Sequence, residues 1–310
     1  MPIGKGHLKT ILVTLSALVA FAANSIICRL ALAGGAIDAA SFSTIRLTSG
    51  ALVLLGIMGF LGKMGRSQQR GDWVSASMLF LYAVAFSFAY VTLGVGTGAL
   101  LLFGAVQATM VLAGWCAGER PRLIQWTGLC LALGGLVWLV FPGLNAPSIE
   151  GAILMTTAGM AWGIYSLRGR GSLDPVAMTS KNFVRSVPFV LAVSLIMVAR
   201  IHLSPEGVFL AIFSGSLASG IGYVAWYAAL HALTAVRAAM VQLSVPVLAA
   251  LGGVLFLSET VSMRLLISAG AILFGVGLSV SGQESLAHEG KGVSLICRRN
   301  GTPHSRTPIG

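Results

Sequence analysis

Residues 73–118 contain no charged side chain, and this gap limits the possible folds of the chain more than any other feature. A helix needs about 20 apolar residues to cross the hydrocarbon layer of a bilayer, so the gap alone has room for two crossings. The whole chain has the same bias, with 56% hydrophobic and 9% charged residues, whereas soluble domains carry about 25% charged residues. We therefore predict an all-α membrane protein that crosses the lipid bilayer many times.

Charged residues, prolines and glycines divide the chain into ten apolar segments. The alternation of polar and apolar positions that is typical of membrane β-strands is missing from the sequence, so each segment is predicted to be a transmembrane helix. The polar and basic residues 283–310 are predicted to form a disordered cytoplasmic tail. The ten expected helices are 10–32, 39–61, 73–93, 97–118, 123–141, 149–167, 175–199, 207–230, 236–257 and 263–282.

The net charge of +11 comes from Lys and Arg in short loops and in the tail. This is the distribution of cytoplasmic loops, not that of a surface that binds nucleic acid. With a cytoplasmic N-terminus, the external ends of the helices carry only Arg29, Arg200 and Arg264, so we predict that both termini are cytoplasmic. The four cysteines have no metal-binding spacing, and we expect neither a metal site nor a cofactor.

The two halves of the chain resemble each other at a few matched positions. Each half holds five predicted helices, an odd number, so the second half must be inserted upside down relative to the first. We predict a first repeat at residues 10–141 and a second, inverted repeat at 149–282. Inverted repeats are typical of transporters that work by alternating access, with the substrate site where the repeats meet. The matched pairs are Asp38 with Asp174, Tyr90 with Tyr227, and Glu119 with Glu259.

Several short motifs follow one another in a fixed order along these helices. They are the segment from Asp38 to Arg46, Gly96-Thr97-Gly98-Ala99-Leu100, Gly118-Glu119-Arg120, and Gln242-Leu243-Ser244-Val245-Pro246 followed by Ser258-Glu259. With them the chain resembles the EamA group of the drug/metabolite transporter superfamily over residues 10–282. The fourth helix departs from the family pattern, because it has Gln107-Ala108-Thr109 where the family often has a proline. The resemblance implies a permease for a small metabolite in a bacterial inner membrane.

Arg46 lies about eight residues, or about 12 Å, inside the second predicted helix. A charge at that depth costs about 2.5–3.5 kcal/mol to insert, so it must be paired or face a wet cavity. Arg185 lies at a similar depth in the seventh helix, whereas all nine acidic residues fall at helix ends, in loops or in the tail. The interior thus holds cations without a fixed anion, which favours an anionic substrate. The alternative for each arginine is a structural role, with the side chain bonded to backbone carbonyls.

Polar and aromatic side chains within the predicted helices complete the candidate substrate site. For each of them the alternative is packing or a place in the interfacial belt. Glu119 and Glu259 are candidates for gating or coupling, or else they mark helix ends and pair with loop arginines such as Arg120, Arg122 and Arg264. The candidate substrate-binding residues are Asn24, Arg46, Tyr82, Gln107, Trp162, Tyr165, Arg185, Tyr223 and Gln242.

These features together predict a secondary-active transporter of an amino-acid-like metabolite or another small organic anion. A passive channel, or an exporter of hydrophobic neutral metabolites, is the alternative. The sequence has no GxxxxGK[ST] motif, so we do not expect ATP to drive transport within this chain. All five histidines lie outside the predicted helices, and the acidic residues lie at helix ends, in loops or in the tail, so we assign no catalytic residue and do not expect an enzyme. Coupling to protons or other ions is left open.

Overall fold

The computed structural model of the chain describes residues 5–64, 71–116, 123–141, 146–169, 172–230, 241–242, 244–275 and 277–278. Within these residues the regular structure is helical, apart from one antiparallel bridge between Ile37 and Leu203, which confirms the predicted all-α class. The elements are α1 (Lys5–Ala33), α2 (Ala39–Phe60), α3 (Trp73–Tyr90), α4 (Val95–Cys116), α5 (Leu123–Val140), α6 (Ile149–Gly169), α7 (Pro175–Ile196), η1 (Val198–Arg200), α8 (Pro205–Phe213), η2 (Ser214–Ile221), α9 (Gly222–Leu230), α11 (Ser244–Leu257) and a last helix at Met263–Gly275.

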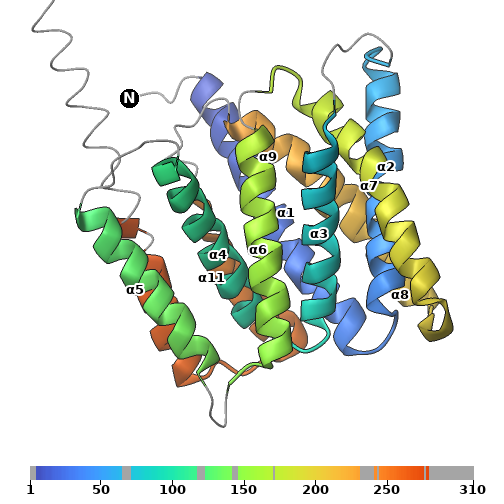
Figure 1. Cartoon of the computed structure of the whole chain (residues 1–310). Helices are drawn as coiled ribbons and strands as arrows, with labels where there is room; N and C mark the ends of the chain where they lie inside the picture. The colour runs from blue at the N-terminus through green and yellow to red at the C-terminus, as the bar shows by residue number, and fades with distance from the viewer. Residues whose placement is uncertain are drawn as a thin grey trace, which may run out of the picture.

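Five of the described helices are long and apolar enough to cross a membrane. These helices run side by side in the bundle (Figure 1). In the same view, α5 lies at one edge of the bundle and α2, α7 and α8 lie at the other. The bundle has two ends, which we name the Asp38 end, where α2 begins, and the Asp72 end, where α3 begins. The five candidate spans are Thr10–Ala33, Ala39–Phe60, Trp73–Tyr90, Val95–Ala113 and Pro205–Leu230.

Aspartates cap the first turns of three helices and explain where those helices begin. The carboxylate of Asp38 accepts a hydrogen bond from the amide of Ser41 at 2.9 Å, and Asp72 and Asp174 cap α3 and α7 in the same way. The first amides of a helix have no partner within the helix, so a side-chain oxygen at this position stabilises it by about 1 kcal/mol. These acidic residues lie at helix entrances, as the sequence pattern indicates.

The packing of the bundle follows from small side chains at helix contacts. A Cβ atom at Gly159 of α6 would lie 2.5 Å from the carbonyl oxygen of Leu102 in α4, and one at Gly275 would lie 2.5 Å from that of Gly128 in α5. In a lipid environment, helices associate by close van der Waals contact, which small residues permit. As a result α6 packs along α3 and α4, α1 packs along α8, η2, α9 and α11, and α5 lies against the last helix.

The closest helix contact joins α2 to η2, an eight-residue π-helical segment between α8 and α9. A Cβ atom at Gly215 would overlap the carbonyl oxygen of Arg46 and the hydroxyl of Ser49, and one at Gly50 would lie 2.9 Å from the carbonyl oxygen of Gly215. π-Helical segments are rare in proteins, and those that do occur are often found at functional sites. This contact places the side chains of η2 directly beside Arg46.

We expect Gly215→Ala to destabilise the protein, because its methyl group would meet backbone that cannot move away easily. Overpacking of this kind costs about 1–3 kcal/mol. Gly56→Ala is the matched control, since a Cβ atom at Gly56 of α2 meets nothing within 4 Å and alanine is the better helix former. Thermal unfolding in detergent should show a lower midpoint for Gly215→Ala and an equal or higher one for Gly56→Ala. Equal midpoints for the two variants would contradict the close contact.

Candidate functional site

Arg46 of α2 is the most deeply buried charge among the described residues, with 1% of its surface exposed. Its Nε donates to the hydroxyl of Ser219 in η2 at 2.9 Å. Its Nη2 donates to the hydroxyls of Tyr82 in α3 at 3.2 Å and of Tyr223 in α9 at 3.1 Å. The guanidinium therefore ties three helical elements together at the centre of the bundle. Its partners are hydroxyl groups from other helices rather than the backbone carbonyls of the structural alternative.

Two aromatic rings lie against the guanidinium of Arg46. Its central carbon is 5.3 Å from the ring centre of Tyr82 and 5.0 Å from that of Phe86. The negative face of an aromatic ring attracts a cation, by about 2 kcal/mol where water is excluded. Hydroxyls and rings together solvate the charge of Arg46 without neutralising it.

Further rings extend this cluster away from Arg46. Trp162 of α6 lies 4.9 Å from Tyr82 and 4.7 Å from Tyr223, measured between ring centres. Phe21 of α1 lies 5.7 Å from Trp162 and 5.9 Å from Tyr223. We call the set of Phe21, Tyr82, Phe86, Trp162 and Tyr223 the aromatic cage. It takes one or two rings from each of four helices, and it joins the predicted residues Arg46, Tyr82, Trp162 and Tyr223.

No carboxylate pairs with Arg46 within the part of the chain that the structure describes. The ion pairs there lie at the ends of the bundle. They are Arg29 with Glu259 at 3.6 Å, Lys63 with Asp174 at 3.0 Å, and Arg168 with Asp72. In addition, Nη1 of Arg46 is buried and has no hydrogen-bond partner among the described residues. The site thus combines an uncompensated positive charge with an unused donor.

The other predicted substrate-binding residues are spread over the bundle. Asn24 of α1 contacts η2, where its side-chain amide oxygen accepts a hydrogen bond from the hydroxyl of Ser214 at 2.7 Å. Tyr165 continues the line of rings from Trp162 at 5.6 Å toward Tyr227. Gln107 lies between α4 and α5, beside Leu129 and Ala132. The structure thus brings Tyr165 next to the cage and separates Gln107 from it.

Arg185 does not join Arg46. Its guanidinium lies 5.5 Å from the ring centre of Trp73, against the backbone of Gly71 at the Asp72 end. Gln242 is buried, with 4% of its surface exposed. Glu119 lies outside the described residues.

Glu259 fixes the start of α4. Both of its carboxylate oxygens accept hydrogen bonds from the amide of Val95, at 3.0 and 2.8 Å, and Arg29 lies 3.6 Å from one of them. Arg29 also donates to the carbonyl oxygens of Tyr90 and Val91. The arginine that Glu259 meets is thus Arg29 of α1 and not Arg264, which donates to the carbonyl of Phe141 instead.

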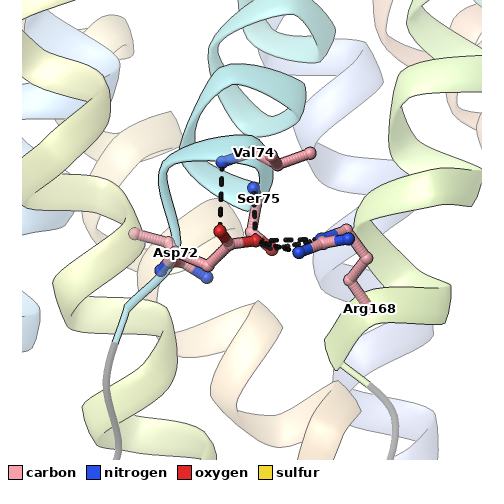
Figure 2. A network of polar contacts seen from close by, with 5 residues as sticks. Asp72, Val74, Ser75 and Arg168 are labelled. Carbon is pink, nitrogen blue, oxygen red and sulfur yellow. Dashed lines mark hydrogen bonds and ion pairs between the residues drawn. The ribbon is translucent and has the colours of Figure 1, made fainter.

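A second polar network lies at the Asp72 end (Figure 2). Arg168 of α6 donates through both Nε and Nη2 to one carboxylate oxygen of Asp72, and its Nε also lies 3.2 Å from the hydroxyl of Ser75. Burial acts to raise the pKa of Asp72, but the hydrogen bonds from Arg168, Ser75 and Val74 outweigh it and lower the pKa to about 2. This ion pair joins α3 to α6.

The Asp38 end is hollowed. A pocket of about 540 Å³ lies there between the ends of α1, α2, α3, α6 and α7. Its wall is mainly apolar, with Leu32, Phe88 and Leu154, and the charged residues Asp38, Glu150 and Arg200 also line it. The Asp38 end thus carries both this pocket and the ion pair of Arg29 with Glu259.

Sequence reasoning did not find three members of the site, Phe21, Phe86 and Ser219. Phe21 and Phe86 are apolar residues in apolar helices, so no local signal separates them from packing residues. The run Ser214-Gly215-Ser216 was a visible signal for close helix contact, but the π-helical turn that aims Ser219 at Arg46 was not predicted.

Comparisons with known proteins agree with this architecture. The model of the EamA-like transporter family matches residues 149–281. An uncharacterized protein of Pseudomonas aeruginosa is 50% identical over 87% of this chain and 94% of its own length. A protein of Salmonella typhimurium named "probable amino-acid metabolite efflux pump" is 26% identical over 64% of this chain and 71% of its own. A solved crystal structure shares the fold, with a TM-score of 0.61 at 18% identity over 87% of this chain and 96% of that one.

Membrane-length helices packed around a buried polar centre define an integral membrane protein of the transporter class. The chain belongs to the EamA-like transporter family. It is a transport protein for a small metabolite and not an enzyme.

The lowered pKa of Asp72 leads to a prediction about pH. A carboxyl whose pKa is lowered on folding stabilises the fold above its ordinary pKa of 3.8 and loses this effect as the pH falls through about 2. Between about pH 5 and about pH 8 the contribution of the ion pair with Arg168 should therefore be constant. The unfolding midpoints of the wild type and Asp72→Asn should differ by a constant amount across that range. A difference that shrinks from about pH 7 to about pH 5 would contradict the assignment.

Proposed function

We propose that this protein is a secondary-active transporter that carries a small organic anion, amino-acid-like metabolites included, by alternating access between two inverted repeats. The observation that carries the proposal is Arg46. It is a guanidinium with 1% exposure that no carboxylate of the described residues neutralises, and it has a buried donor without a partner.

The free energy of a buried charge explains why an anion is the expected substrate. A charged side chain in the membrane interior is costly, and such residues mark substrate pathways by default. The hydroxyls of Ser219, Tyr82 and Tyr223 stabilise the guanidinium, but a carboxylate would add full charge compensation and a charge-assisted hydrogen bond. The site therefore gains more from an anion than from a neutral or cationic molecule.

Cross-wise contacts between the halves support the inverted repeat of residues 10–141 and 149–282. Asp38, at the start of α2, accepts a hydrogen bond at 3.0 Å from the amide of His202, which follows α7. Asp174, at the start of α7, is bonded at 3.0 Å by Lys63, which follows α2. Such an exchange of partners is expected of two helices related by a two-fold axis in the membrane plane. The packing of α6 on α3 and α4 corresponds in the same way to that of α1 on α8, η2, α9 and α11.

The pocket at the Asp38 end supports alternating access. It corresponds to a state that is open on that side, and the ion pairs Asp72–Arg168 and Lys63–Asp174 join helices at the other end. The Lys and Arg residues of the sequence gather at the Asp72 end, so we assign that end, and both termini, to the cytoplasm of a bacterial cell. The ten helical segments of the sequence then give ten crossings.

The name of the Salmonella typhimurium relative fits this substrate class, because amino-acid metabolites carry a carboxylate. The aromatic cage also favours a second candidate, an exporter of hydrophobic neutral metabolites, since its walls are rings. The two candidates differ in whether the charge of Arg46 is needed.

We expect Arg46→Gln to abolish counterflow of carboxylate substrates in liposomes, because glutamine removes the compensating charge. Arg264→Gln is the matched control, because Arg264 donates to the carbonyl of Phe141 near the Asp38 end, away from the cage. Trans-stimulated exchange in the wild type identifies a carrier, and its absence would identify a channel. Unchanged exchange in Arg46→Gln would overturn the anion proposal and favour neutral metabolites.

The same assay tests whether Arg185, which lies beside Trp73, belongs to the transport path. Loss of exchange in Arg185→Gln would extend the transport path along α7 to the Asp72 end. Full exchange would limit the path to the Arg46 site.

A further inference from the structure

The guanidinium of Arg46 has one donor group left for a ligand. Its Nε is used by Ser219 and its Nη2 by two tyrosines, whereas Nη1 is buried without a partner. A carboxylate binds a guanidinium best through two adjacent nitrogens. A ligand carboxylate would take Nη1 and displace one tyrosine hydroxyl from Nη2. The site thus offers donors for one carboxylate on one edge of Arg46.

A second negative charge would have no compensating cation in this part of the structure. Three of the other described basic side chains form ion pairs, and Arg185, whose Nη1 has no hydrogen-bond partner among the described residues, lies beside Trp73 at the Asp72 end. Arg29 binds Glu259, Lys63 binds Asp174, and Arg168 binds Asp72. Around Arg46 the walls are the rings of the aromatic cage, and a charge left unpaired among them would carry its full desolvation cost.

An ammonium group would also be poorly held in this site. No carboxylate of the described residues reaches the cage, and the faces of Tyr82 and Phe86 that attract cations are already covered by Arg46. A second cation beside the guanidinium would be repelled by it. An α-amino group should therefore weaken binding rather than strengthen it.

The body of the ligand would lie among rings. A void of about 10 Å³, the room for a single water, lies between Phe21, Phe86, Leu102 and Trp162. The rings must therefore separate to admit a ligand. The apolar body of the ligand then covers the ring surfaces that no longer contact one another. Because Trp162 touches Phe21, Tyr82 and Tyr223, its surroundings change when the cage opens.

We propose that the Arg46 site selects an organic monoanion, namely one carboxylate on an apolar body without an amino group. This inference rests on the proposed function and narrows it from organic anions in general. The selectivity comes from one free edge of a single guanidinium within walls of aromatic rings.

The test uses four probes with one phenyl group each and different charge. They are 3-phenylpropionate (monoanion), 3-phenylpropanamide (neutral), phenylsuccinate (dianion) and L-phenylalanine (zwitterion). Binding to the full chain in lipid nanodiscs is followed by tryptophan fluorescence and by competition in counterflow. We expect 3-phenylpropionate to bind about tenfold or more tightly than each of the others, as the loss of one charged hydrogen bond implies.

Variants separate the site from nonspecific binding. In Arg46→Gln the preference for 3-phenylpropionate over its amide should disappear, and Arg264→Gln should keep it. Because Arg46→Gln removes three buried hydrogen bonds and threatens folding, Arg46→Lys provides a second variant. Lysine keeps the positive charge but lacks the two adjacent nitrogens of the guanidinium. Arg46→Lys should therefore retain part of the preference for the monoanion. Trp162→Phe should remove most of the fluorescence change while it keeps the order of affinities measured by competition.

The outcomes distinguish this inference from the function on which it rests. Equal or tighter binding of phenylsuccinate or L-phenylalanine, lost in Arg46→Gln, would overturn the monoanion inference and leave anion transport standing. Equal binding of 3-phenylpropanamide and 3-phenylpropionate in the wild type, unaffected by Arg46→Gln, would overturn both.

Discussion

The guanidinium of Arg46 is the interaction on which the centre of this protein depends. A charge at that depth is tolerated only if its surroundings replace water, and hydroxyls and rings from α3, η2 and α9 do so. Each of these elements is held in place by the charge that it solvates. The proposed binding centre and the packing centre of the bundle are therefore the same group, and a ligand that binds Arg46 would act on three helical elements at once.

Small residues make this arrangement possible. α2 and η2 approach closely because Gly50 and Gly215 have no side chain at the contact, and the π-helical turn brings Ser219 within 2.9 Å of Arg46. A wider spacing of these helices would leave the charge beyond the reach of its partners. Ion pairs lie at the periphery instead, where water remains available and where Asp72 and Arg168 join α3 to α6.

Sequence reasoning located Arg46, Tyr82, Trp162 and Tyr223, and the structure brings these four together. It could name them because each is a polar or amphipathic residue deep in an apolar helix, where a local rule applies. The rule cannot distinguish residues at the cage from other residues of the same type. Gln107 obeys it but lies between α4 and α5, and Phe21 and Phe86 carry no signal at all. Arg185 lies in the predicted helix yet turns toward Trp73, because the rotation of a helix about its axis is set by its neighbours.

The sequence by itself determined that the chain is an all-α membrane protein, where α2, α3 and α7 begin, and that its interior contains arginine without carboxylate. These properties follow from composition and from caps within a few residues, so they need no knowledge of distant contacts. Only the tertiary structure decided which side chains surround Arg46 and which end of the bundle is hollow. Both depend on how closely and at what rotation the helices pack, and residues far apart in the sequence set these quantities together.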